Sequence, residues 1–111
     1  MTREVNSCQR LKLRRKAYII WHMSDMHIWR NEIDRIDTEM QTLFEERMHI
    51  SAEIGAYKAS LGMPVFDAAR EEAKISEIRG RASSEELADG AERLFRKIME
   101  ISRDCQQKLQ D

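Results

Sequence analysis

The sequence has few of the residues that build disulfide frameworks, metal knuckles or flexible linkers. Its two cysteines, Cys8 and Cys105, form no CxxC pair, so neither a zinc knuckle nor a disulfide framework is indicated. Such sparing use of cysteine suits the reducing cytoplasm. The three histidines, His22, His27 and His49, do not have the spacing of a metal site. With one proline and four glycines in 111 residues, the composition is typical of one small soluble domain.

Neither sign of charge dominates, and no apolar run is long. There are 19 basic and 20 acidic side chains, and a net charge of −1 gives no bulk attraction to nucleic acid or to a membrane surface. The apolar stretch at 17–21 is shorter than the roughly 7–15 residues of a signal-peptide core, so no targeting segment or membrane span is predicted. Residues 1–22 carry six basic side chains against one acid. We interpret them as a basic N-terminal extension without fixed order, and residues 23–111 as the functional domain.

The apolar positions that follow predict one long helix. It should begin between Ser24 and Ile28 and stop at Gly62 and Pro64. About 35 residues at about 1.5 Å each make a rod of roughly 50 Å, which is longer than a compact domain of this size is wide. Part of the rod must therefore pack outside its own protomer. The alternating three- and four-residue steps run through Ile33, Ile36, Met40, Leu43, Ile50, Ile54, Tyr57 and Leu61.

Two further helices are expected after this rod. Asp67 can cap a short helix that ends near Gly80. Residues 83–86, Ser-Ser-Glu-Glu, then resemble a capping box for a third helix. No alternating β-branched run is present, so we predict an all-α fold of three helices: long, short, long. The apolar stripe of the third helix consists of Leu87, Ala91, Leu94, Ile98, Ile101, Cys105 and Leu109.

Basic side chains interrupt the apolar face of the long helix. Arg47 stands between Leu43 and Ile50, where an aliphatic residue is expected, and Lys58 follows eleven residues later on nearly the same face. An inward cation is costly unless an anion or a satisfied network meets it. Arg30 lies on the same stripe but about 25 Å before Arg47, which is too far for both to hold one small ligand. In an antiparallel pair of rods, Arg30 could complete the partner's pocket and make the dimer obligatory.

The other two helices add polar groups that fit a pocket for a small dianion. Asp67, Arg70 and Glu71 share a face of the second helix, and Ser102 and Gln106 lie four residues apart on the third. The set contains cations, carboxylates, a hydroxyl and an amide, but no obvious nucleophile with a base and no histidine pair. It suits holding and polarising a small dianion rather than covalent or hydrolytic chemistry.

These residues, in this order and spacing, resemble the all-helical chorismate mutases. The resemblance extends from about residue 28 to residue 106. It implies an intertwined homodimer that rearranges chorismate to prephenate, in phenylalanine and tyrosine biosynthesis, without metal or cofactor. The motifs that carry it are Arg30-x-x-Ile33-Asp34-x-Ile36-Asp37, Glu46-Arg47, Tyr57-Lys58, Pro64-Val65-x-Asp67-x-x-Arg70-Glu71 and Leu94-Phe95-x-x-Ile98-Met99-x-x-Ser102-x-x-x-Gln106.

The resemblance also implies a role for each site residue. Arg30 would reach the partner's pocket, while Arg47 and Arg70, assisted by Ser102, would hold the substrate carboxylates. Lys58 and Gln106 would donate hydrogen bonds to the ether oxygen of the breaking bond. Glu71, with the backbone near Asp67, would receive the ring hydroxyl. The predicted catalytic residues are thus Lys58, Gln106, Arg47 and Glu71, and the predicted substrate-binding residues are Arg30, Arg70, Asp67 and Ser102.

Several alternatives stay open from the sequence alone. Arg47 could form a structural ion pair with Glu46 or Asp104. The fold and basic pocket also fit an isochorismate-pyruvate lyase, although the Val-x-Asp-x-x-Arg-Glu segment and Ser102 favour the mutase. A non-catalytic helical dimer that regulates or binds another enzyme is a third possibility. Mutases of this type often occur fused to prephenate dehydratase, prephenate dehydrogenase or the first enzyme of the pathway.

Overall fold

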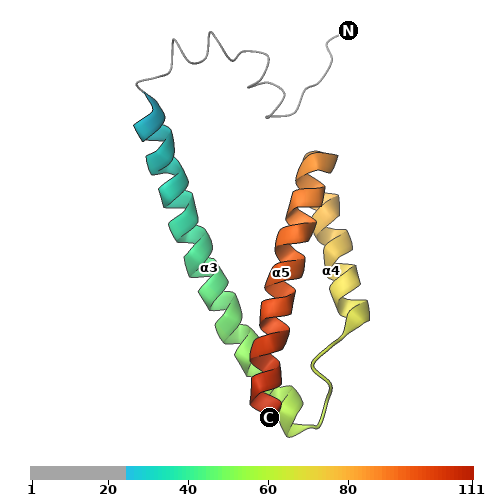
Figure 1. Ribbon diagram of the computed structural model, residues 1–111. Coiled ribbons are helices and arrows are strands. Elements are labelled where there is room, and N and C mark those ends of the chain that lie inside the picture. Colours follow the sequence, from blue (N-terminus) through green and yellow to red (C-terminus); the bar gives the residue numbers. More distant parts are fainter. Residues whose placement is uncertain (1–24) are drawn as a thin grey trace. The chain divides into compact units, whose positions relative to one another are not determined.

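The computed structural model describes residues 25–111, and this part of the chain forms three helices and no strand. The helices are α3 (Met26–Ser60), α4 (Ala68–Arg81) and α5 (Glu85–Gln110) (Figure 1). The predicted all-α fold of a long, a short and a long helix is therefore confirmed. The predicted extension at residues 1–22 lies outside the described residues, as does Ser24, the earliest expected start of the long helix. No helix in the described range is long and apolar enough to cross a membrane.

The end of α3 follows directly from one glycine. Gly62 has a φ of 65°, a left-handed conformation that glycine adopts without steric cost. Its N–H donates to the carbonyl of Ala59 at 3.2 Å, and the N–H of Met63 donates to the carbonyl of Lys58 at 2.8 Å. These two bonds satisfy the last carbonyls of the helix in a Schellman arrangement. The chain then turns toward α4, which confirms the predicted stop at Gly62 and Pro64.

Side-chain caps set the beginnings of α4 and α5. Asp67 accepts a hydrogen bond from the backbone N–H of Arg70 at 3.1 Å, as the sequence predicts. The predicted capping box before α5 is wrong. Ser84, not Ser83, is the cap and accepts from the N–H of Leu87 at 3.1 Å. Because the third helical residue is then leucine, no carboxylate can reach back to the cap as the box requires.

The described residues fall into two units, 25–42 and 43–111. In the first, residues 26–42 belong to α3, and charged side chains on it form local pairs such as Arg35 with Glu32 and Glu39. In the second, α4 and α5 lie side by side (Figure 1) and enclose a small apolar core. Ile75, Ile78 and Met99 are the buried members of that core, with Ala91 and Phe95 packed against them.

Candidate active site

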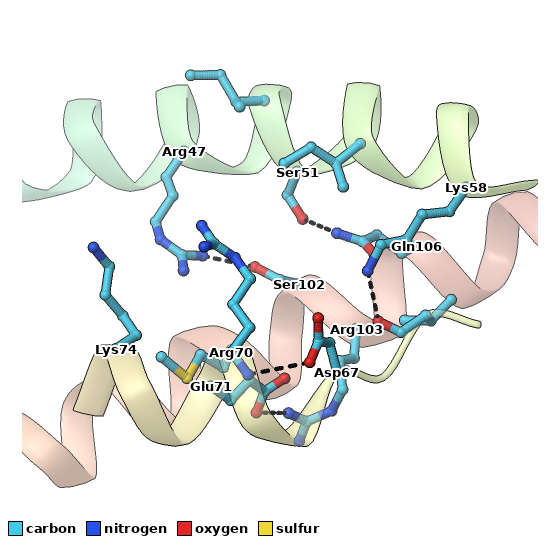
Figure 2. Close-up of a pocket in the computed structure, with 14 residues that line it drawn as sticks. Arg47, Ser51, Lys58, Asp67, Arg70, Glu71, Lys74, Ser102, Arg103 and Gln106 are labelled. Atoms are coloured by element: carbon cyan, nitrogen blue, oxygen red, sulfur yellow. Dashed lines mark hydrogen bonds and ion pairs between the residues drawn. The ribbon is translucent and has the colours of Figure 1, made fainter. Parts of the chain in front are cut away.

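A cavity of about 280 Å³ opens within the unit formed by residues 43–111. Its walls come from the second half of α3, the first turns of α4 and the second half of α5 (Figure 2). This volume is near the lower end of the range found for small-molecule pockets. The lining residues are Arg47, Ile50, Ser51, Ile54, Lys58, Val65, Asp67, Arg70, Glu71, Lys74, Met99, Ser102, Arg103 and Gln106.

Arg47 reaches from α3 to α5. Its guanidinium donates to the hydroxyl of Ser102 at 2.8 Å, and that buried hydroxyl in turn lies 3.7 Å from the sulfur of Met48. In the described part of the chain, no carboxylate forms an ion pair with Arg47. Neither Glu46 nor Asp104 therefore neutralises it. The guanidinium keeps most of its hydrogen-bonding capacity for an anion in the cavity.

Lys58 and Gln106 meet at the other end of the cavity. The ammonium of half-buried Lys58 donates to the backbone carbonyl of Val65 at 3.0 Å and, within residues 25–111, pairs with no carboxylate. The amide nitrogen of Gln106 donates to the hydroxyl of Ser51 at 2.9 Å. Figure 2 shows the Gln106 amide between Ser51 and the Lys58 ammonium. An ammonium and an amide, both donors, thus lie next to each other at this wall.

The first turn of α4 brings together both acids of the cavity and a further cation. The guanidinium of Arg70 extends from α4 into the space beside Arg47 (Figure 2) and forms no ion pair among the described residues. Glu71 is engaged differently, because its carboxylate accepts a hydrogen bond from the guanidinium of Arg103 on α5. Arg103 also stacks over the ring of Phe66, with its guanidinium carbon 5.0 Å from the ring centroid.

Seven of the eight predicted site residues line this one cavity, and Arg30 does not. Arg30 is exposed on the part of α3 that precedes residue 43. The structure adds three polar lining residues that sequence reasoning missed, namely Ser51, Lys74 and Arg103. Helical spacing offered a signal for each, because Ser51 follows Arg47 by four residues, Lys74 follows Arg70 by four, and Arg103 precedes Gln106 by three.

The cavity carries an excess of positive charge. Five cationic side chains and two carboxylates line it. Arg103 is neutralised by Glu71, and Lys74 pairs with Glu77 at 3.2 Å. Arg47, Lys58 and Arg70 remain without a carboxylate in the described range. Such a group of cations with directed donors suits a small molecule that bears more than one negative charge.

Comparison with known families gives the site its context. The family model described as "Chorismate mutase type II" matches residues 29–107, which include all eight predicted site residues. No curated protein and no solved structure matches the chain. The match supports chorismate mutase activity, and hence an isomerase, at the level of the family. By this match over most of its length, the chain belongs to the chorismate mutase type II family.

Proposed function

We propose that this protein is a cytoplasmic chorismate mutase that converts chorismate to prephenate on the route to phenylalanine and tyrosine. The observation that carries the proposal is the group of three unneutralised cations, Arg47, Lys58 and Arg70, around one small cavity. Chorismate is a small dianion with one carboxylate on its ring and one on its enolpyruvyl side arm. A cavity with several free donors and few acids is complementary to such a molecule. We assign the functional domain to residues 23–111.

The carboxylates of the substrate are assigned to the arginines. Arg47, steadied by its 2.8 Å hydrogen bond to Ser102, holds one of them, and Arg70 contributes a second guanidinium from α4. Guanidinium groups bind carboxylates through paired, directional hydrogen bonds, so two of them restrict how the flexible side arm can turn. This restriction favours the chair-like geometry in which the two reacting carbons lie close together.

The reacting bond is assigned to Lys58 and Gln106. The [3,3] rearrangement breaks a carbon–oxygen bond and forms a carbon–carbon bond without a proton transfer, so it needs no general acid or base. Negative charge develops on the ether oxygen, and a prepositioned donor stabilises such charge by about 3–4 kcal/mol. Glu71 accepts a hydrogen bond from the ring hydroxyl, and the backbone near Asp67 also contacts that hydroxyl. No metal or cofactor is required for any of these steps.

The active enzyme is proposed to be an intertwined homodimer. On α3 the apolar side chains Ile28, Ile33, Ile36 and Met40 are 39% to 56% exposed in the single chain. A row of exposed apolar residues on one helix is typical of a protein interface. A second copy of α3 would cover it, and the partner subunit's Arg30 would then complete the cavity.

A mixing experiment tests the reaction and the shared site together. Chorismate consumption is followed in the ultraviolet for the wild type, Lys58→Ala and Arg30→Ala, and the product is identified. We expect rapid formation of prephenate by the wild type and almost none by either variant. Refolding the two variants together should restore about a quarter of the activity, because half of the dimers are mixed and each then has one intact site.

The other possible outcomes separate the alternatives. Pyruvate released from isochorismate, with no prephenate from chorismate, would identify a lyase. A folded dimer without turnover on either substrate would leave a binding or regulatory protein. Wild-type activity without recovery in the mixture would preserve the reaction and overturn the role of Arg30.

A further inference from the structure

Ser51 lines the cavity, but the proposed mechanism gives it no role. It is only 6% exposed. The other buried polar residues in the described range are Ser102 and Gln106. The hydroxyl of Ser51 accepts a hydrogen bond from the amide nitrogen of Gln106 at 2.9 Å, from α5 to α3 (Figure 2). Both residues line the cavity. Ser51 therefore contacts the side chain to which the ether oxygen is assigned.

The hydrogen bond limits what the Gln106 amide can do. A primary amide nitrogen has two N–H donors, and the bond to Ser51 uses one of them. The second stays available for a ligand. Because the long glutamine side chain has several rotatable bonds, an amide without a partner would sample many orientations, and ordering it on binding would cost free energy. The bond to Ser51 restricts that sampling before the substrate arrives.

Gly55 provides a second restriction on the same side chain. It lies one helical turn after Ser51 on α3 and is buried. A Cβ atom at this position would come within 2.8 Å of Cγ and 3.1 Å of Cβ of Gln106. The absence of a side chain at Gly55 thus lets the aliphatic part of Gln106 lie directly against the α3 backbone. Gln106 is held at its stem by Gly55 and at its amide by Ser51.

We propose that Ser51 is a positioning residue that fixes the amide of Gln106, so that its free N–H is ready for the oxygen of the breaking bond. The inference rests on the proposed chorismate mutase function. Ser51 itself need not touch the substrate. Its effect passes through Gln106, and removal of its hydroxyl should slow the chemical step more than it weakens substrate binding.

A double-mutant cycle tests this inference. The kcat and KM for chorismate, together with the thermal unfolding midpoint, are measured for the wild type, Ser51→Ala, Gln106→Ala and the double variant. We expect Ser51→Ala to lower kcat about 10-fold, the effect of losing one hydrogen bond in the transition state, with KM changed by less than about threefold. In the Gln106→Ala background, the same substitution should change kcat by less than about twofold, because the group it positions is gone.

Ser60→Ala is the matched control. Ser60 is on the same helix, but its hydroxyl is exposed and donates to the backbone carbonyl of Tyr57 at 2.7 Å. Its loss should leave kcat unchanged. If Ser51→Ala does not fold, Ser51→Cys keeps most of the volume and weakens the hydrogen bond, and it should lower kcat several-fold.

Each other result has a definite meaning. A Ser51→Ala enzyme with a lower unfolding midpoint but wild-type kcat would show a purely structural role and overturn the inference. Equal losses of kcat in both backgrounds would also overturn it, because Ser51 would then act independently of Gln106. Absence of turnover in the wild type would remove the proposed function and this inference together. If the wild type does convert chorismate, the proposed function stands and the variants at Ser51 test this inference alone.

Discussion

The cavity and the outer surface of the α4–α5 pair use the same charged residue types but neutralise them differently. On the outer surface, Arg79 pairs with Glu85, Asp89 and Glu92, at 3.0, 2.8 and 3.0 Å. Arg96 joins Glu72 on α4 to Glu92 on α5, at 2.9 and 2.7 Å. In the cavity, Arg47, Lys58 and Arg70 have no carboxylate partner among the described residues.

This contrast shows in the titration behaviour of the outer network. The hydrogen bonds from Arg96 lower the pKa of Glu72 and of Glu92, and those to Glu72 and Glu92 raise the pKa of Arg96. The hydrogen bond to Asp89 is the main reason that the pKa of Arg79 is raised. The charged form of each of these groups is therefore stabilised by its neighbours. The outer charges are thus satisfied by the protein itself, whereas Arg47, Lys58 and Arg70 in the cavity are open to an anion from outside.

The largest predicted difference in kcat is between variants of two lysines, one in the cavity and one on the outer surface. Lys58→Ala should lower kcat about 100- to 1000-fold, because a donor aimed at developing negative charge is lost. Lys97→Ala removes the same charge from the outer surface, where Lys97 pairs with Glu100 at 3.3 Å, and should change kcat by less than about twofold. Steady-state rates of chorismate loss, with circular dichroism to confirm folding, measure both. Similar rates for the two variants would remove the distinction between the regions.

A smaller effect is expected at Arg103, where the two regions meet. Arg103 lines the cavity but is neutralised by Glu71, so it combines a site position with an internal partner. Arg103→Ala should lower kcat/KM about 10-fold, because the carboxylate that receives the ring hydroxyl loses the charged hydrogen bond that orients it. The comparison is kcat/KM for Arg93→Ala, an exposed arginine on the same helix. An unchanged value for Arg103→Ala would mean that Glu71 does not need this partner.

Helical periodicity explains why so much of the cavity was predictable. Residues four, seven or eleven positions apart on one helix share a face whatever the rest of the fold does, so Arg47 and Lys58 could be placed together from spacing. The cap at Asp67 and the stop at Gly62 depend on local chemistry and were equally accessible. These local rules were sufficient to predict the three helices and seven of the residues that line the cavity.

The features that were missed depend on tertiary contacts or on competing local signals. The partner of Arg103 is Glu71, 32 residues away on another helix, and no local spacing reveals that pair. Ser51 has significance only because Gln106 packs on Gly55, four residues further along α3. Before α5, the spacing from Ser83 to Glu86 fits a capping box, but the adjacent Ser84 provides the cap instead. The role of Arg30 stays a prediction, since it depends on a second chain.

The smallest predicted effect concerns acid stability and belongs to the outer network. Because Arg96 lowers the folded-state pKa of Glu72 and Glu92 below the ordinary value of 4.5, both carboxylates contribute stability above that value, and this contribution is lost as the pH falls through their folded pKa values. Arg96→Ala should therefore unfold a few degrees below the wild type at pH 7, and the gap should narrow at pH 3. Arg81→Ala is the control, because Arg81 is exposed and its pair with Glu77 is long, at 3.9 Å. Thermal unfolding monitored by circular dichroism at several pH values measures both gaps. A gap for Arg96→Ala that stays constant with pH would mean that Arg96 acts through packing of its side chain and not through these two carboxylates.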